Sequence, residues 1–331
     1  MKQIYGIDLS KEKFNVNFIN VNGILKDAEI KNNYSGICKF LDSIDQDVIL
    51  CIEHTGIYGD LLIFLANCLS IPICAIPGYE IKHSLGLQRG KSDPLDASKI
   101  RQYGERFRDK LVEARFCTEQ MHELKELQSL RDMLVKQRKM LRTHEKEKDR
   151  APYCSKMARE ISEVVLRNLD DQIGETENQI QEIINSTEEL ANNSRLILSI
   201  NGIGPVTTNE LIIKTQNFKK INTARKASSF AGVCPFPNSS GKMVKKAKVS
   251  PMGDKKLKSL LYLCASSAIQ YNKDMKYYYQ RKLAEGKPSY LALNNVANKL
   301  LRTIYAIIES RKMWDPMHVC LDPRNSDKKV A

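Results

Sequence analysis

The sequence predicts a mixed α/β domain at the N-terminus and an almost entirely helical remainder. Three observations indicate this. Five short β-type runs occur before residue 80, glycine is absent between Gly104 and Gly174, and apolar residues recur at helical spacing from residue 196 onward. A chain of 331 residues is long enough for two or three domains. We expect an α/β domain over residues 1–110, a coiled-coil helical hairpin over 111–195, a mostly helical domain over 196–320 and a mobile tail over 321–331.

The first domain is expected to begin with three antiparallel strands. Ile4–Asp8 is short and apolar, Phe14–Phe18 alternates apolar and polar residues, and Ile24–Ile30 follows a turn at Asn22-Gly23. The next expected elements are a helix over 35–45, a central strand over 48–52, a helix over 59–69 and a strand over 73–76. Three antiparallel strands that lead into strand–helix units are typical of an RNase H-like (RuvC-like) fold, although other folds share this order.

The hairpin is predicted from a drifting heptad pattern. The first helix carries leucines three, four and seven residues apart, the second carries Ile and Val with the same drift, and Ala151-Pro152 breaks the run between them. The apolar positions are Leu127, Leu130, Leu134, Leu141, Ile161, Val165, Ile173, Ile180 and Ile184. A helix of about 30 residues would extend roughly 45 Å. We interpret the hairpin as a spacer or dimerisation arm.

Two features of the third domain suggest contact with phosphate. Gly202 and Gly204 flank Ile203 between helical patterns, which suits either a helix-hairpin-helix element with backbone N–H groups facing a phosphate or an ordinary turn. Between Lys242 and Lys258 there are seven lysines against one acid, Asp254. That excess is too large for a helix covered by salt bridges, so we interpret the lysines as a nucleic-acid contact, in particular Lys242, Lys245, Lys246, Lys248, Lys255 and Lys256.

Charge and cysteine usage restrict the possible partners and compartment. The net charge of +13 favours a polyanionic partner. The nine cysteines have no C-x-x-C spacing, and their number is odd, which argues against structural zinc and a disulfide framework. We find no signal peptide and no apolar stretch long enough to span a bilayer. The expectation is a reduced, cytoplasmic protein without a membrane partner.

Four acidic residues are candidate metal ligands. Asp8 and Glu53 each end an apolar strand run, where a carboxylate is costly unless a positive group meets it. Asp93 and Asp96 stand at the start of a predicted helix, where they also suit N-cap and N3 positions without any metal. Hard oxygen ligands suit Mg²⁺, and phosphoryl transfer commonly uses two ions roughly 4 Å apart. The set therefore suggests phosphodiester chemistry.

A serine is the candidate nucleophile. Ser239 and Ser240 lie in a polar Asn-Ser-Ser-Gly stretch just before the lysines, which by itself reads as an ordinary loop. The functional interpretation is attack of a serine on phosphorus, with lysines stabilising the transition-state charge. None of the five histidines is near this stretch in sequence, so a metal would have to lower the pKa of the serine.

These residues together resemble the DEDD transposases of bacterial insertion sequences, the family that includes the pilin-gene inverting recombinases. The resemblance covers residues 5–13, 52–58, 91–97, 200–204, 230–232 and 240–241. It implies a RuvC-like domain, a coiled coil and a serine-bearing transposase domain. Where such proteins commonly have a basic residue after Ile-Ser, this chain has Pro251.

The resemblance also implies a function. Asp8, Glu53, Asp93 and Asp96 would bind Mg²⁺, and Ser240, which precedes a glycine, would form a phosphoserine link to DNA. The partners would be double-stranded DNA, a structured guide RNA and further copies of the chain, as a dimer or tetramer that shares active sites, on the bacterial nucleoid. Two alternatives are open: a RuvC-type structure-selective nuclease that uses water as nucleophile, and a non-catalytic RNA- or DNA-binding protein.

Overall fold

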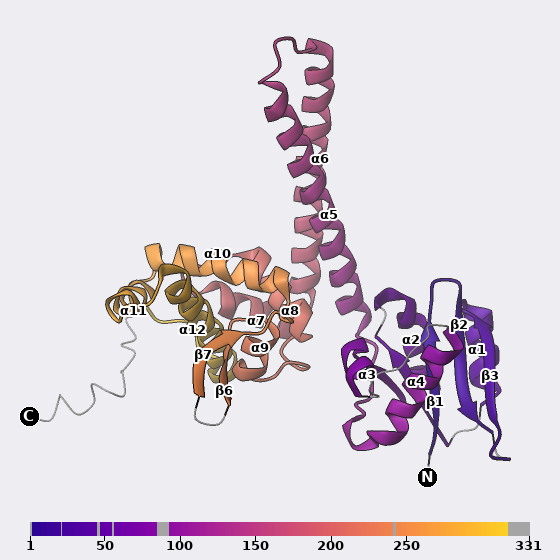
Figure 1. The fold of residues 1–331 in the computed structure, drawn as a ribbon. Coiled ribbons are helices and arrows are strands. Elements are labelled where there is room, and N and C mark those ends of the chain that lie inside the picture. The colour runs from indigo at the N-terminus through magenta and orange to yellow at the C-terminus, as the bar shows by residue number, and fades with distance from the viewer. Residues whose placement is uncertain are drawn as a thin grey trace, which may run out of the picture. The chain divides into compact units, whose positions relative to one another are not determined.

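The computed structural model describes residues 2–20, 22–44, 47–54, 56–84, 93–240 and 243–316, without the side chains of 237–240 and 243–248. The chain divides into two compact units, Met1–Cys117 and Thr118–Ala331 (Figure 1). Lys242 and the tail over 321–331 lie outside the described residues. Among the described residues, no helix has both the length and the apolar character needed to cross a bilayer.

The first unit is built on a five-stranded mixed sheet with the order β3-β2-β1-β4-β5. β1 pairs antiparallel with β2, β2 pairs antiparallel with β3, and β4 and β5 continue the sheet in parallel from β1. The strands are β1 (Gln3–Leu9), β2 (Lys13–Ile19), β3 (Leu25–Lys31), β4 (Val48–Glu53) and β5 (Ile73–Ile76), each within two residues of its prediction. The order is consistent with an RNase H-like fold.

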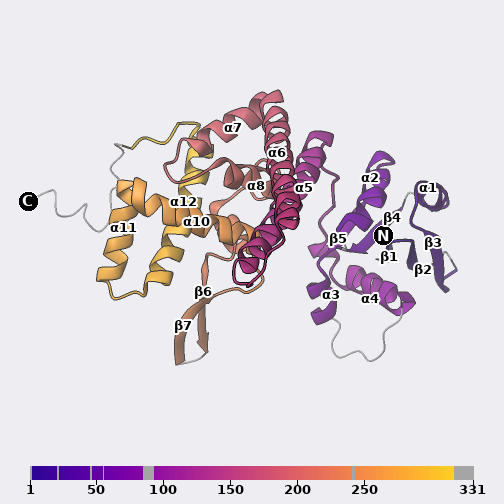
Figure 2. The ribbon, with the colours of Figure 1, turned by 90° about the horizontal axis from the view of Figure 1, so that it is seen from above.

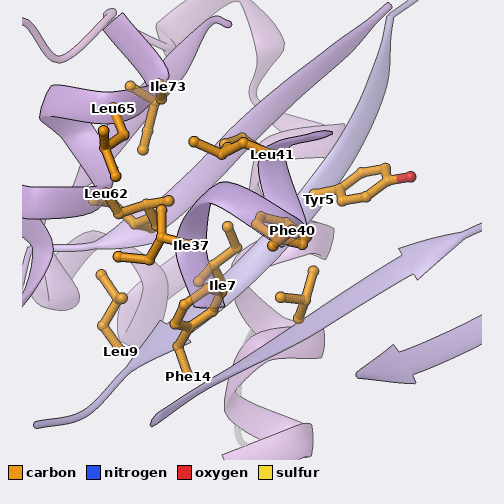
Figure 3. Close-up of a cluster of buried hydrophobic side chains, with 14 of the residues drawn as sticks. Tyr5, Ile7, Leu9, Phe14, Ile37, Phe40, Leu41, Leu62, Leu65 and Ile73 are labelled. Carbon is orange, nitrogen blue, oxygen red and sulfur yellow. The ribbon is translucent and has the colours of Figure 1, made fainter. Parts of the chain in front are cut away.

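Helices cover both faces of this sheet (Figure 2). One face packs against α1 (Tyr34–Asp42) and α2 (Asp60–Cys68), and Figure 3 shows the resulting core, which includes Ile7, Phe14 and Leu62. The other face packs against α3 (Gly78–Ser84) and α4 (Asp93–Arg106) through Ile4, Cys51 and neighbouring side chains. Short 3-10 turns η1 (Gly56–Gly59) and η2 (Arg108–Lys110) complete the unit. Because side chains alternate along a strand, β1, β4 and β5 each contribute to both layers.

The second unit begins with two long helices that pack along each other, α5 (Glu119–Lys148) and α6 (Lys156–Ser186) (Figure 1). The predicted helical hairpin is therefore observed, with its break at Ala151-Pro152. Apolar side chains such as Leu124 and Ile180 are buried between the helices and the rest of the unit. Arg138 and Arg142 both hold Asp170 across the pair, at 2.6 and 2.8 Å.

Among its described residues, the rest of this unit consists of helices and one β-hairpin. The elements are α7 (Glu188–Leu198), α8 (Pro205–Thr215), α9 (Ala224–Phe230), β6 (Pro235–Ser240), β7 (Met243–Val249), α10 (Lys255–Tyr271), α11 (Lys273–Ala284) and α12 (Ser289–Ser310). Sequence analysis predicted only a polar loop and a lysine run where β6 and β7 pair. The boundary between an arm and a serine-bearing domain near residue 195 stays a prediction, since α5–α12 belong to one compact unit.

Candidate metal site and nucleic-acid interface

Asp8 and Glu53 lie side by side at one end of the sheet. Ile7 of β1 is paired in parallel register with Ile52 of β4, so Asp8 and Glu53 occupy the next position on neighbouring strands. Residues in register on adjacent strands present their side chains to the same face. Ile7 and Ile52 point into the core beneath α1 and α2. Asp8 and Glu53 therefore belong to the opposite face, which α3 and α4 cover.

α4 crosses this face at a very short distance from β1. A Cβ atom on Gly6 would lie 2.2 Å from the Ala97 carbonyl oxygen and 2.3 Å from the Arg101 nitrogen, so only glycine allows this approach. Farther along the helix, Gly104 packs on Ile4. α4 thus runs antiparallel to β1, and its first turn, which carries Asp93 and Asp96, extends toward the Asp8 end of the strand.

Two of the acidic side chains, Asp96 and Glu53, each have a defined neighbour. Asp96 accepts a hydrogen bond from Lys99 at 2.6 Å. The Glu53 carboxylate lies against Gly78, where a Cβ atom would be only 2.1 Å from Glu53 Oε1. Lys13, on β2, has a raised pKa because of its hydrogen bond and charge interaction with Glu29, and the charge of Asp93 adds to the effect.

The four carboxylates fit a divalent cation by donor type and by backbone position, since all are hard oxygen donors directed to one end of one face. Their side chains do not converge on a common point in this structure. Within the described part of the chain, no three His, Cys, Asp or Glu side chains are close enough together to hold a metal ion. Lys99 contacts only Oδ1 of Asp96, so metal binding requires the carboxylate side chains to converge on positions that the backbone already brings together.

A buried polar network, which the sequence analysis did not identify, fixes α4 on the sheet. The Arg101 Nε–H donates to Asn17 Oδ1 at 2.6 Å, and Asn17 Nδ2 donates to Asp27 Oδ1 at 2.6 Å. Arg101 and Asn17 are both buried. This network joins β3, β2 and α4 two turns after Asp93. No signal in the sequence marks this network, because Asn17 occupies a polar position in the alternation of β2 and only its pairing with Gly6 brings it beneath α4.

Gly78→Ala is expected to displace the Glu53 carboxylate while leaving the fold intact, because the flexible end of a side chain is what must move. A displacement near 1 Å at a reacting centre costs up to about a hundredfold in rate. We expect at least a tenfold fall in cleavage of a DNA substrate, with an unchanged thermal unfolding temperature. Gly174→Ala in α6 is the matched control, because its Cβ atom meets nothing within 4 Å. Equal cleavage by both variants would contradict the placement of Glu53.

Ser240 and three of the six candidate lysines lie on the β-hairpin of the second unit. Ser240 is the last residue of β6 and pairs with Met243, and Ser239 pairs with Val244. Lys245, Lys246 and Lys248 lie on β7. The structure therefore places Ser240 at the strand end next to the lysines in sequence. Ser240 and the carboxylates belong to different units, and their meeting stays a prediction.

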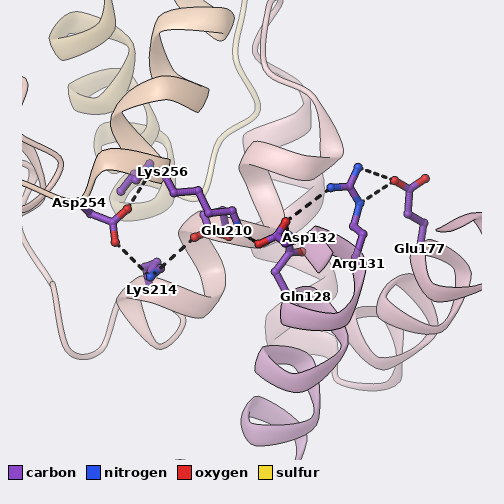
Figure 4. A network of polar contacts seen from close by, with 9 residues as sticks. Gln128, Arg131, Asp132, Glu177, Glu210, Lys214, Asp254 and Lys256 are labelled. Carbon is purple, nitrogen blue, oxygen red and sulfur yellow. Dashed lines mark hydrogen bonds and ion pairs between the residues drawn. The ribbon is translucent and has the colours of Figure 1, made fainter. Parts of the chain in front are cut away.

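Lys256 and Lys255 differ sharply in their surroundings. Lys255 is exposed at the start of α10, as a nucleic-acid contact would require. Lys256 instead holds Glu210 of α8 at 2.5 Å and also pairs with Asp132 of α5 (Figure 4). Glu210 is 1% exposed. Lys256 thus has a structural role that sequence analysis did not identify, and its contact with nucleic acid stays a prediction.

Of the two glycines between α7 and α8, only Gly202 is required by close packing. Gly202 has a φ of +103°, and a Cβ atom there would lie 2.7 Å from the Ala268 backbone in α10. Gly204 is the N-cap of α8, with open space where its side chain would be. Burial raises the pKa of the Cys264 thiol, while hydrogen bonds from Thr207 and from the Gly204 backbone oppose that rise. The Gly204 backbone thus contacts the interior, and phosphate binding by this turn stays a prediction.

Comparison with known proteins gives matches over both units. A transposase family of the DEDD IS110 type matches residues 5–147, and the family described as "Transposase IS116/IS110/IS902 family" matches residues 194–280. A pilin gene-inverting protein of Moraxella bovis is 26% identical over 326 residues, which cover 95% of this chain and 98% of the relative. The "Insertion element IS900 uncharacterized 42 kDa protein" of Mycobacterium paratuberculosis is 27% identical over 149 residues, 45% of this chain and 36% of the relative.

The first unit has a mixed sheet with acidic residues at one end of the face that α3 and α4 cover, and a helical unit follows it. Together with these matches, this arrangement defines a DNA transposase or recombinase. Within that class the chain matches the DEDD transposase domain over residues 5–147 and the IS116/IS110/IS902 transposase domain over residues 194–280. Such an enzyme acts on DNA, and DEDD transposase domains use divalent metal ions.

Proposed function

We propose that the chain excises and inserts a mobile DNA element with Mg²⁺ bound by Asp8, Glu53, Asp93 and Asp96, two ions in each composite site. The observation that carries this proposal is the parallel register that sets Asp8 beside Glu53 under the acidic first turn of α4. Bound Mg²⁺ would neutralise charge that develops on the phosphate and lower the pKa of a hydroxyl nearby.

Ser240 supplies the nucleophile in this proposal. Its Oγ loses a proton and forms a bond to phosphorus, the bond from phosphorus to the leaving strand's oxygen breaks, and that oxygen takes up a proton. The result is a phosphoserine link that a second DNA end can resolve by the reverse attack. The lysines of β7 next to Ser240 in sequence provide positive charge for the phosphate.

The helical hairpin supports the proposal that copies of the chain assemble. Between Arg131 and Gln172, a stretch that is described throughout, no side chain is fully buried. Several apolar residues there are strongly exposed, including Met140 at 69%, Met157 at 72% and Ile161 at 60%. An exposed apolar face on a two-helix arm is typical of an association surface. We propose a dimer or tetramer in which Ser240 of one copy meets the carboxylates of another.

Guidance by a structured RNA is the remaining part of the proposal. The net charge of +13 is compatible with RNA as well as DNA, and the similarity to insertion-sequence transposases motivates it. A noncoding stretch beside the gene whose loops pair with target and donor DNA would support it.

The proposed chemistry is tested by trapping a covalent adduct. Incubation of the full-length chain with labelled DNA that carries the element ends, followed by denaturing electrophoresis, should give a protein–DNA band. Ser240→Ala should abolish the band with DNA affinity unchanged, and Ser239→Ala is the matched control one residue away. Cleavage that persists in Ser240→Ala without any adduct would show that water is the nucleophile, as in a RuvC-type nuclease.

A further inference from the structure

The second unit contains a pocket whose lining includes none of the residues proposed for catalysis. It has a volume of about 600 Å³ and lies between α7, the segment that joins α8 to α9, and the C-terminal half of α12. Its lining includes Asn193, Asn217, Phe218, Arg302, Tyr305 and Arg311. A volume of this size falls in the range of sites that enclose a small ligand or a single nucleotide.

A chain of hydrogen bonds orients one amide in this pocket. Arg311 donates to Asn193 Oδ1 at 2.6 Å, and Asn193 Nδ2 donates to Asn217 Oδ1 at 2.7 Å. Asn193 is 1% exposed and Asn217 is 6% exposed. Within the described residues, nothing accepts a hydrogen bond from Asn217 Nδ2. Asn217 lines the pocket and its Nδ2 is not sealed from solvent, so the pocket presents this N–H group to water or to a ligand.

The backbone holds Asn217 in place at a conformational cost. Gln216, Asn217 and Phe218 are three successive left-handed residues, with φ of 49°, 53° and 66°. Asparagine tolerates this conformation but phenylalanine rarely adopts it. Neighbouring bonds keep the segment strained, among them Asn217 N–H to the Ile212 carbonyl at 2.7 Å and Phe218 N–H to Thr215 Oγ1 at 2.9 Å. Strain of this kind is concentrated at functional sites.

The charges and rings of the pocket indicate the ligand class. Glu189 and Lys219 neutralise each other at 3.0 Å, which leaves two cations, Arg302 and Arg311, against Glu309. Phe218 and Tyr305 form an edge-to-face pair at 5.1 Å in the wall. The ligand should therefore carry negative charge, hydrogen-bond acceptors and a planar apolar surface. A nucleotide has all three, and only an unpaired one can enter a pocket with its base.

We propose that this pocket binds one unpaired nucleotide of the single-stranded nucleic acid handled by this transposase. Asn217 Nδ2 donates to an acceptor on the base, and Arg302 and Arg311 lie near its phosphate. The inference rests on the proposed handling of nucleic acid but not on Ser240 or the carboxylates. The unpaired nucleotide could come from RNA or from an opened DNA strand, and the chemistry of recognition is shared.

Asn217→Asp is the sharpest test. Aspartate keeps the acceptor for Asn193 and tolerates the left-handed conformation, but it replaces the free donor with an anionic acceptor. Asn222→Asp at the exposed rim of the same pocket adds the same charge and is the matched control. Affinities of the full chain would be measured by fluorescence anisotropy with labelled single strands of about 20 nucleotides, as RNA and as DNA, and with the duplex of that DNA.

We expect Asn217→Asp to weaken single-strand binding at least about tenfold, with duplex binding changed less than about threefold, and Asn222→Asp to have little effect on either. A loss confined to the RNA arm, or to the DNA arm, identifies the source of the nucleotide. Equal losses for the two variants, or equal losses for single strand and duplex, would overturn the proposal. Absence of the Ser240 adduct in a chain that still shows this pattern would reject the proposed chemistry alone.

Discussion

Asp8→Asn is expected to lower the rate of DNA strand cleavage at least about a hundredfold, while DNA binding and the fold are unchanged. Asp8 is adjacent in register to Glu53, so the substitution removes a negative oxygen donor at the centre of the proposed metal site. Electrostatic stabilisation of a phosphoryl transition state typically contributes at least this much. Gel assays of cleavage at several Mg²⁺ concentrations would measure the rate, and thermal unfolding with and without Mg²⁺ would measure metal binding directly.

Asp42→Asn is the matched control for charge removal in the same unit. Asp42 is exposed at the end of α1, which covers the opposite face of the sheet from the proposed site. A mixture of Asp8→Asn chains with Ser240→Ala chains should recover part of the activity if the two half-sites come from different copies. Cleavage by Asp8→Asn at the normal rate would contradict the metal site. If no mixture recovers activity although both chains bind DNA, the sharing of active sites between copies would be contradicted.

Much of the fold could be predicted because its local signals agree. β4 is a continuous apolar run and β2 alternates, so strand type and order followed from side-chain periodicity. The helical hairpin was visible because glycine disappears and Pro152 marks the turn. The β6–β7 hairpin was missed because lysines occupy positions of β7 that an apolar alternation would need, and antiparallel pairing with β6 outweighs that weak pattern.

Sequence analysis identified the acidic side chains of the candidate site but not the contacts that support them. A carboxylate that ends an apolar run is visible in sequence, and the register of β1 with β4 then brings Asp8 and Glu53 together. The supporting contacts were not visible. Arg101 reaches Asn17 across 84 residues, and Gly78 makes room for Glu53 only in the folded domain. The lysine run also looked uniform, although Lys256 is tied to Glu210 and Lys255 is exposed.

Lys256→Met is expected to lower the free energy of unfolding by about 2–3 kcal/mol, measured by urea denaturation. Removal of one partner from a buried pair leaves an uncompensated charge, which typically costs about 3–5 kcal/mol, and we reduce this figure because the Lys256 side chain is 35% exposed. Glu210 would keep only Lys214, whose Nζ is 3.9 Å from Glu210 Oε1. Figure 4 shows that Lys256 also joins Asp132 to this network.

Its neighbour provides the control, since Lys255→Met changes the same charge on the exposed side of α10 and should leave stability within about 0.5 kcal/mol. Glu210→Gln added to Lys256→Met should restore part of the lost stability, because the buried charge is then removed as well. Nucleic-acid binding should show the opposite pattern to stability. Lys255→Met should lower the salt dependence of the binding affinity by about one phosphate contact, and Lys256→Met should leave it unchanged. If Lys256→Met lowered the affinity for nucleic acid but not the free energy of unfolding, Lys256 would be shown to contact phosphate. The buried Glu210 carboxylate would then not need Lys256 for its stability.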